Sequence, residues 1–138
     1  MSTIRSHVTR DIVSIDAAAP CREAARLMAD RKIGSVAVQE GGRFIGLATE
    51  RDLVATVLAR GADGLMPVRE AMRALPRVGP GATEAECAAL MRDQFTRHLL
   101  VEEAGQVVGV VSMRDIIQLM LDEKQFVIEQ LQEYIGKS

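Results

Sequence analysis

The chain has 138 residues, of which 48% are hydrophobic, so it holds enough apolar material for the core of one compact domain. Its formal net charge is −2, acidic and basic residues are mixed along it, and its aromatic residues are one tyrosine and three phenylalanines. This composition argues against nucleic-acid binding, which needs a basic patch or an aromatic platform for bases. The first residues lack the apolar core of a signal peptide, and no apolar run reaches the roughly 18 residues of a membrane span. We therefore expect a cytoplasmic protein without membrane attachment.

An internal repeat organises the sequence. When the chain is shifted by 63 positions, residues 23–58 align without a gap with residues 86–121, and 12 of the 36 aligned pairs are identical. Two copies are too few for a solenoid, which needs about three. We expect the copies to pack about a pseudo-twofold axis, so that a ligand bound between them would find two related sites.

The first copy reads as alternating strands and helices. In chain order we expect an extended piece at Val13–Asp16, a helix near Cys21–Arg31, a strand at Ser35–Gln39, a return strand at Arg43–Ala48 and a helix from Thr49 to about Arg60. Gly41 and Gly42 form the hairpin turn, and the run from Gly61 to Gly64 ends the last helix.

The second copy repeats this order. Its expected elements are an extended piece at Pro76–Gly79, a helix at Glu84–Gln94, strands at His98–Glu102 and Gln106–Val111 around a turn at Ala104-Gly105, and a helix from Ser112, with a short helix at Val68–Arg73 before them. Each copy is therefore β-α-β-β-α, and the whole is an α/β protein of layered helices and sheets. We divide it into a first unit at 1–63, a second unit at 64–121 and a helical extension at 122–138.

The last helix continues beyond the end of its repeat. It runs to Ile135, and its apolar residues at helical spacing form a stripe of Val127, Ile128, Leu131, Tyr134 and Ile135. This stripe either covers the domain's own core or contacts a second subunit. We favour the subunit contact, and hence a homodimer, because the helix leaves less of its own domain to cover.

The two cysteines, Cys21 and Cys87, lie at non-equivalent repeat positions, each near the start of an expected helix. No second Cys or His lies at ligand spacing, so we expect reduced thiols packed in the core and no metal site.

One motif occurs twice and suggests a chemistry. A strand that holds a glycine (Gly46 or Gly109) leads to a hydroxyl residue, and an Arg and an Asp follow it two and three positions later. The three polar positions are Thr49, Arg51 and Asp52 in the first copy and Ser112, Arg114 and Asp115 in the second. A helix N-terminus, a hydroxyl and a guanidinium all suit phosphate, and a carboxylate can accept from both hydroxyls of a ribose.

The same hydroxyl and Asp spacing also fits an ordinary helix cap. A cap requires neither the Arg nor the glycine, however, and both recur, so we favour nucleotide binding.

The strand after the first helix of each copy carries further candidates. Gly34 and Ser35 are small enough for a ring to approach the backbone, while Arg97 and His98 replace them in the second copy and could add donors for an anion. The short strands that contain Ile15 and Val78 could contribute apolar side chains around a base.

Residues 4–121 resemble a tandem CBS (cystathionine-β-synthase) domain pair. The resemblance rests on the doubled unit, on the segments Leu27-Met28, Ile33-Gly34-Ser35, Leu90-Met91 and Arg97-His98-Leu99, on the lead-in Met66–Met72, and on the two closing motifs. The tail from Gln125 to Gly136 is similar to that of small stand-alone bacterial members. Copy two departs from the family in having Leu100 where a proline often follows His-Leu.

The resemblance implies a regulatory, signal-transducing module that binds AMP, ATP or NAD in clefts between the copies. It places phosphate on Thr49 and Ser112 and ribose on Asp52 and Asp115, and it brings Ile33 and Leu99 into the ligand-binding segments. It also implies a flat dimer and an effector protein that the sequence does not identify.

Two alternatives stand beside this one. An enzyme is disfavoured because no nucleophile, catalytic carboxylate pair or metal cluster has local support. A purely structural dimerisation module would keep the caps and the apolar tail but would need neither Arg51 nor Arg114.

Overall fold

The computed structural model describes residues 3–136, which form two compact units. Residues 11–75 make the central unit, and the two ends of the chain, up to residue 10 and from residue 76, make the terminal unit. Each unit has its own core and its own three-stranded sheet.

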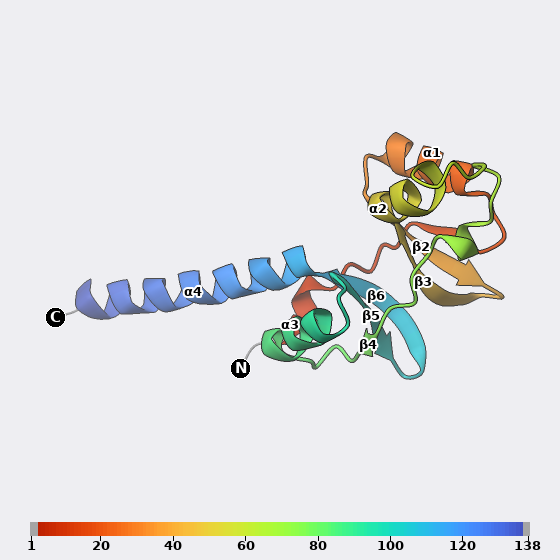
Figure 1. Ribbon diagram of the computed structural model, residues 1–138. Helices are drawn as coiled ribbons and strands as arrows, with labels where there is room; N and C mark the ends of the chain where they lie inside the picture. Colours follow the sequence, from red (N-terminus) through yellow and green to blue (C-terminus); the bar gives the residue numbers. More distant parts are fainter. Residues whose placement is uncertain (1–2, 137–138) are drawn as a thin grey trace. The chain divides into compact units, whose positions relative to one another are not determined.

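The central unit contains the first copy of the repeat (Figure 1). Its elements are β1 (Ser14–Asp16), α1 (Cys21–Arg31), β2 (Ser35–Glu40), β3 (Arg43–Thr49) and α2 (Glu50–Leu53). Strand β2 lies in the middle of the sheet, parallel to β1 and antiparallel to β3. The antiparallel pair is joined by Gly41 and Gly42, which both have positive φ angles and form the expected hairpin turn.

The terminal unit repeats this topology. It contains β4 (Arg77–Val78), α3 (Glu84–Asp93), β5 (His98–Glu103), β6 (Gln106–Ser112) and α4 (Met113–Gly136), with β5 between parallel β4 and antiparallel β6. The structure thus confirms the α/β class, the two β-α-β-β-α units and the long C-terminal helix.

The segments that lead into the two repeats are exchanged between the units. A short 3-10 helix, η1 (Ile4–His7), precedes the first repeat but packs in the terminal unit, where the N–H of Ile4 donates to the carbonyl of Ala82 at 2.9 Å. Its counterpart η3 (Val68–Glu70) precedes the second repeat but packs in the central unit, where the N–H of Val68 donates to Ala19 at 2.8 Å. We call each of these segments a lead-in. Because Ile4 and Val68 are fully buried, the lead-in of each repeat completes the core of the unit that contains the other repeat. The compact units therefore do not coincide with the division at residues 63 and 64 made from the sequence.

This exchange explains the glycine in each closing strand. The lead-in residue Arg73 pairs with Leu47 through two backbone hydrogen bonds of 3.0 Å, and Thr9 pairs with Val110 in the same way at 2.9 and 3.0 Å. A Cβ at Gly46 would meet the carbonyl of Arg73, and one at Gly109 would lie 2.7 Å from the carbonyl of Thr9. The recurrence of glycine, which we interpreted as evidence for a ligand, thus has a structural cause.

The helix expected from Thr49 to Arg60 changes type after one turn. Regular α2 ends at Leu53, and a π-helical segment, η2 (Val54–Leu58), continues it. The equivalent helix α4 buries Ile116 and Leu119, and the repeat counterpart of Leu119 is the polar residue Thr56. A π turn adds one residue, so Val57 takes the inward position and is 8% exposed.

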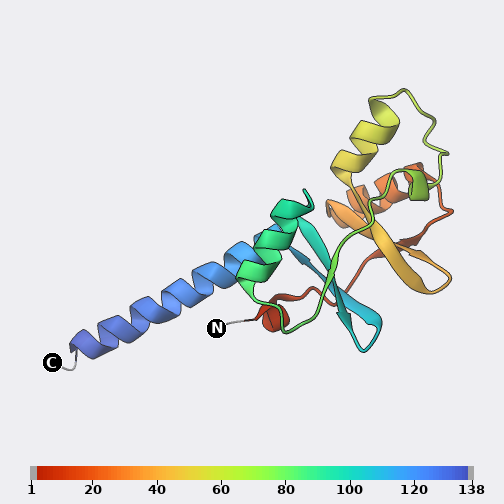
Figure 2. The same ribbon diagram turned by 60° about the horizontal axis from the view of Figure 1, so that its bottom comes forward.

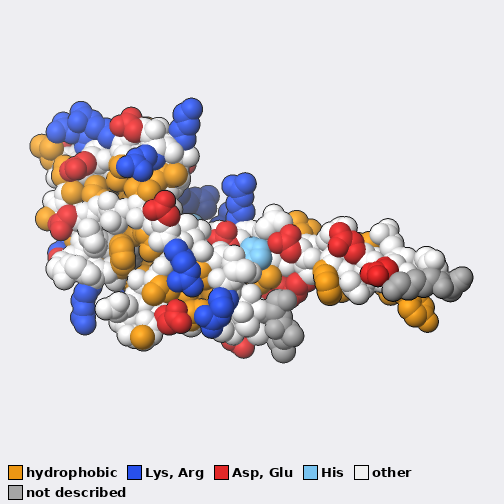
Figure 3. Space-filling model, turned by 180° about the vertical axis from the view of Figure 1, so that it is seen from behind, with side chains coloured by type: hydrophobic (Ala, Val, Ile, Leu, Met, Phe, Trp, Pro, Cys, Tyr) orange, Lys and Arg blue, Asp and Glu red, His pale blue; other side chains and the backbone are white. Residues whose placement is uncertain are grey.

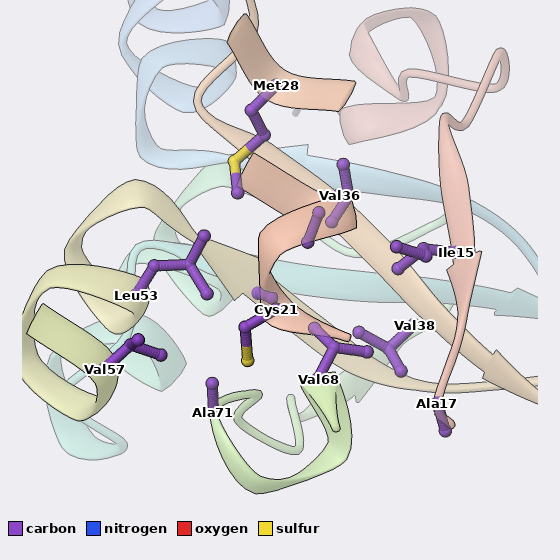
Figure 4. Close-up of a cluster of buried hydrophobic side chains, with 12 residues drawn as sticks. Ile15, Ala17, Cys21, Met28, Val36, Val38, Leu53, Val57, Val68 and Ala71 are labelled. Carbon is purple, nitrogen blue, oxygen red and sulfur yellow. The ribbon is translucent and has the colours of Figure 1, made fainter. Parts of the chain in front are cut away.

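Both cysteines lie in the cores, as expected. In Figure 4 the Cys21 side chain lies in the core of the central unit, on the same side as Val68 and Ala71. Burial is the main cause that raises the pKa of both thiols, and that of Cys87 reaches about 11. Such thiols stay protonated and unreactive at neutral pH.

Helix α4 extends beyond the rest of its unit (Figures 1 and 2). Only Ile116 and Leu119, in its first two turns, are buried, and Leu131 and Ile135 are 57% and 69% exposed. The alternative in which the apolar stripe covers its own core is therefore wrong for the terminal unit. Within residues 3–136, no helix is long and apolar enough to cross a membrane, and this includes the 24-residue α4.

Candidate functional site

The hydroxyl and carboxylate of the doubled motif meet at the start of a helix in both units. The Thr49 Oγ1 accepts from the N–H of Asp52 at 3.1 Å, and Asp52 Oδ2 accepts from the N–H of Thr49 at 2.9 Å. In the terminal unit Ser112 and Asp115 make the same two bonds at 3.1 and 2.8 Å. Ser112 Oγ also donates to Asp115 Oδ2 at 2.9 Å. Both pairs are thus capping boxes that hold the hydroxyl and carboxylate in a fixed position.

Strand pairing brings the second group of candidates beside the first. Ser35 of β2 pairs with Thr49 of β3, and the N–H of Glu50 donates to the carbonyl of Gly34 at 3.0 Å. His98 pairs likewise with Ser112, and the N–H of Met113 donates to Arg97 at 2.8 Å. Each unit therefore assembles five predicted site residues. We call them the Thr49 constellation (Gly34, Ser35, Thr49, Arg51 and Asp52) and the Ser112 constellation (Arg97, His98, Ser112, Arg114 and Asp115).

The charges of the two constellations differ. In the central unit the carboxyl carbon of Glu50 lies 3.7 Å from where a Cβ on Gly34 would stand, so an acid covers the small residue. In the terminal unit Met113 replaces Glu50 and Arg97 replaces Gly34. The Ser112 constellation therefore has no carboxylate in the place of Glu50 and includes the guanidinium of Arg97, which favours an anion there.

The structure adds a residue that the sequence analysis missed. The Nε of Arg73 lies 3.0 Å from Oδ1 of Asp52, whose side chain is only 10% exposed. Arg73 belongs to the lead-in segment that packs in the central unit. The residue in the equivalent position of the terminal unit is Thr9, which has no charge. The sequence does contain a pattern that relates the two lead-in segments. When the chain is shifted by 64 positions instead of 63, Ile4 aligns with Val68 and Arg5 aligns with Arg69.

The arginines of the two constellations and the apolar candidates lie in different environments. Arg51 and Arg114 are exposed, and within the described residues 3–136 neither forms a salt bridge. Four apolar candidates contribute to the cores: Ile15 and Leu99 are buried, and Ile33 and Val78 are partly buried.

The groups gathered in these arrangements are of the kinds that interact with a phosphate and a diol. Each constellation offers a helix start, an exposed guanidinium and a carboxylate at a fixed position. In the part of the chain that the structure describes, no three His, Cys, Asp or Glu residues are placed to hold a metal ion.

Comparison with known proteins matches both copies of the repeat to one domain family. The family model of the CBS domain matches residues 4–59 and again residues 66–122. The CBS domain-containing protein YhcV of Bacillus subtilis is 29% identical over 117 residues, which cover 84% of this chain and 84% of YhcV.

Solved structures agree with the fold. A protein with CBS domains from Burkholderia ambifaria has a TM-score of 0.81 at 28% identity, with 88% of this chain and 95% of that chain covered. The CBS domain protein PAE2072 from Pyrobaculum aerophilum, whose structure is a complex with AMP, has a TM-score of 0.74 at 25% identity. That match covers 83% of this chain and 89% of PAE2072.

Proposed function

Since the chain belongs to the CBS domain family, we propose that it is a regulatory module that binds an adenine nucleotide, AMP, ATP or NAD, at its two constellations. It senses the ligand for an effector protein and performs no catalysis itself. In each constellation the hydroxyl residue and the Arg bind phosphate, and the Asp binds the ribose hydroxyls.

The observation that carries the proposal is the recurrence of an exposed guanidinium beside a capping box. The boxes alone would serve a structural role, which is the competing function. A structural cap gains nothing from Arg51 or Arg114, because neither forms a salt bridge within residues 3–136. The AMP complex of PAE2072 supports an adenine nucleotide as the ligand class.

We place the stronger phosphate site at the Ser112 constellation. Arg97 and His98 add donors there, whereas Glu50 adds a negative charge to the Thr49 constellation. In addition, Asp52 is already paired with Arg73, so a ribose would have to share that carboxylate. The two sites should therefore differ in affinity.

Self-association is the second part of the proposal. The apolar stripe of α4 is exposed over its whole length within the terminal unit, which supports a homodimer through this helix.

Calorimetry with AMP, ADP, ATP, NAD and adenosine tests the nucleotide proposal. Arg114→Ala should weaken AMP more than adenosine, because the guanidinium contacts only the phosphate, and Arg51→Ala, its counterpart in the other unit, is the matched control with a smaller effect. No binding of any ligand at millimolar concentration would favour the structural module instead. Equal losses for AMP and adenosine would remove Arg114 from the phosphate site.

A further inference from the structure

The exposed side of α4 has the spacing of a coiled coil. Six positions alternate at intervals of four and three residues, and they form what we call the α4 seam: Ile117, Leu121, Lys124, Ile128, Leu131 and Ile135. The five apolar members are between 40% and 69% exposed. This spacing is that of the a and d positions of a heptad, which form the seam of paired helices.

The α4 seam is separate from the face that packs on the terminal unit. Ile116 and Leu119, which are 1% and 4% exposed, hold the helix to its own unit from another side. Figure 3 shows apolar side chains open to solvent along the projecting helix. The residues on one flank of the seam are Met120, Val127 and Tyr134, and those on the other flank are Gln118, Gln125 and Gln132. Both flanks are uncharged, so a partner should be apolar and should need no opposite charge.

The seam is complementary to itself in the antiparallel direction. In an antiparallel pair, a positions of one helix face d positions of the other. Leu121 then faces Leu131, Ile128 faces Lys124, and Ile135 faces Ile117 of the second copy, and all three pairs are centred on residue 126. One register therefore covers all six seam positions.

Lys124 decides between the two directions. A parallel pair in register would place Lys124 directly against Lys124 of the second copy, inside the seam. In the antiparallel register it faces Ile128, and the two lysines are offset by four residues, about 6 Å along the helix axis. Its methylene chain can then cover Ile128 while the ammonium group reaches water.

We propose that α4 forms an antiparallel two-stranded coiled coil with α4 of a second copy, centred near residue 126. This inference rests on the proposed self-association and is independent of nucleotide binding.

Disulfide trapping tests the register. The full-length variant with both Leu121→Cys and Leu131→Cys should form a covalent dimer in mild oxidant, because each pair faces across the seam within reach of a disulfide. Each single variant should stay uncrosslinked, because its two thiols lie ten residues apart along the axis, about 15 Å. Gln130→Cys, outside the seam, and the wild type, with Cys21 and Cys87 buried, are the controls.

Each remaining outcome overturns the proposal. Efficient crosslinking of the single variants would show a parallel pair. If the double variant does not crosslink although its circular dichroism is unchanged, the seam does not pair in this register. Its mass in light scattering then shows whether the protein is a monomer or a dimer through another surface. Binding of AMP, measured on the same samples, separates failure of this proposal from failure of the nucleotide proposal.

Discussion

The two aspartates of the constellations differ in what else they hold. Among the described residues 3–136, the Asp115 side chain has hydrogen bonds to Ser112, whereas the Asp52 side chain forms its capping bonds with Thr49 and also the ion pair with Arg73. Asp115→Asn keeps a capping residue and should lower the free energy of unfolding by about 1 kcal/mol or less. Asp52→Asn also loses a half-buried ion pair and should cost about 1–2 kcal/mol. Urea unfolding of both variants measures this difference.

The same variants test the ribose assignment. Each should weaken nucleotide binding at its own site by about 1.5–3 kcal/mol, because a charged acceptor is lost. Calorimetry that finds wild-type affinity in both variants would leave the aspartates with a capping role only.

Glu84 makes stability depend on pH. One of its carboxylate oxygens is buried without a hydrogen-bond partner among the described residues. Loss of solvent, and next the negative charge of the neighbouring Glu123, raise the pKa of Glu84. A raised acid pKa means that the folded state is penalised once the group ionises. The penalty is absent below the ordinary pKa of a glutamate and complete above the raised value.

Replacing Glu84 should therefore stabilise the protein at neutral pH. Glu84→Gln should unfold at a higher urea concentration than the wild type at pH 7, and the gain should shrink as the pH falls below the ordinary glutamate pKa. Glu86→Gln, in the same helical turn, is the control. A gain that is equal at both pH values would mean that ionisation of Glu84 is not its cause.

The residue contacts that sequence could predict are the local ones. The caps at Thr49 and Ser112 follow from a spacing of three residues, which a helix start fixes by itself. The ion pair between Asp52 and Arg73 joins residues that are 21 positions apart. This ion pair exists because the lead-in that contains Arg73 pairs with β3. A local sequence pattern cannot predict such a long-range pairing.

At the scale of elements, the strands, the hairpins and most of the helices could be predicted from apolar runs, glycines and helical spacing. The π-helical turn could not be predicted, because it depends on tertiary packing, which buries Val57 in place of the polar Thr56. The exchange of lead-ins could not either, since alignment at 63 positions leaves them outside the repeat.

The exchange predicts where a methyl group is not tolerated. Gly46→Ala would drive a Cβ into the carbonyl of Arg73, within the backbone pairing that completes the central unit. Gly46→Ala should lower the free energy of unfolding by about 1–3 kcal/mol, the usual cost of overpacking. Gly81→Ala, where the added Cβ would meet nothing within 4 Å, is the control and should be near neutral. Equal midpoints in urea for the two variants would show that the lead-in does not press on β3.

At the scale of the whole molecule, the apolar content of α4 is large for a helix left in water. Full burial of a large apolar side chain stabilises by about 1.5–3 kcal/mol, and the apolar side chains on the α4 seam and its apolar flank are half exposed or more, except Ile128 at 40%. Burying the exposed half of eight such side chains in each of the two copies contributes about 12–24 kcal/mol. The association penalty that opposes it is about 4–15 kcal/mol. The gain exceeds the penalty over most of these two ranges, which favours a dimer.

Charges on the seam should separate the copies without unfolding them. Leu131→Asp combined with Ile135→Asp places four carboxylates in the dimer's seam, so light scattering should report the mass of one chain. Thermal unfolding of the globular part should change little, because both side chains are exposed within their own unit. Glu129→Asp with Gln130→Asp carries a similar helix-propensity cost outside the seam and should remain a dimer. A folded seam variant that keeps the dimer mass would place the subunit contact on another surface.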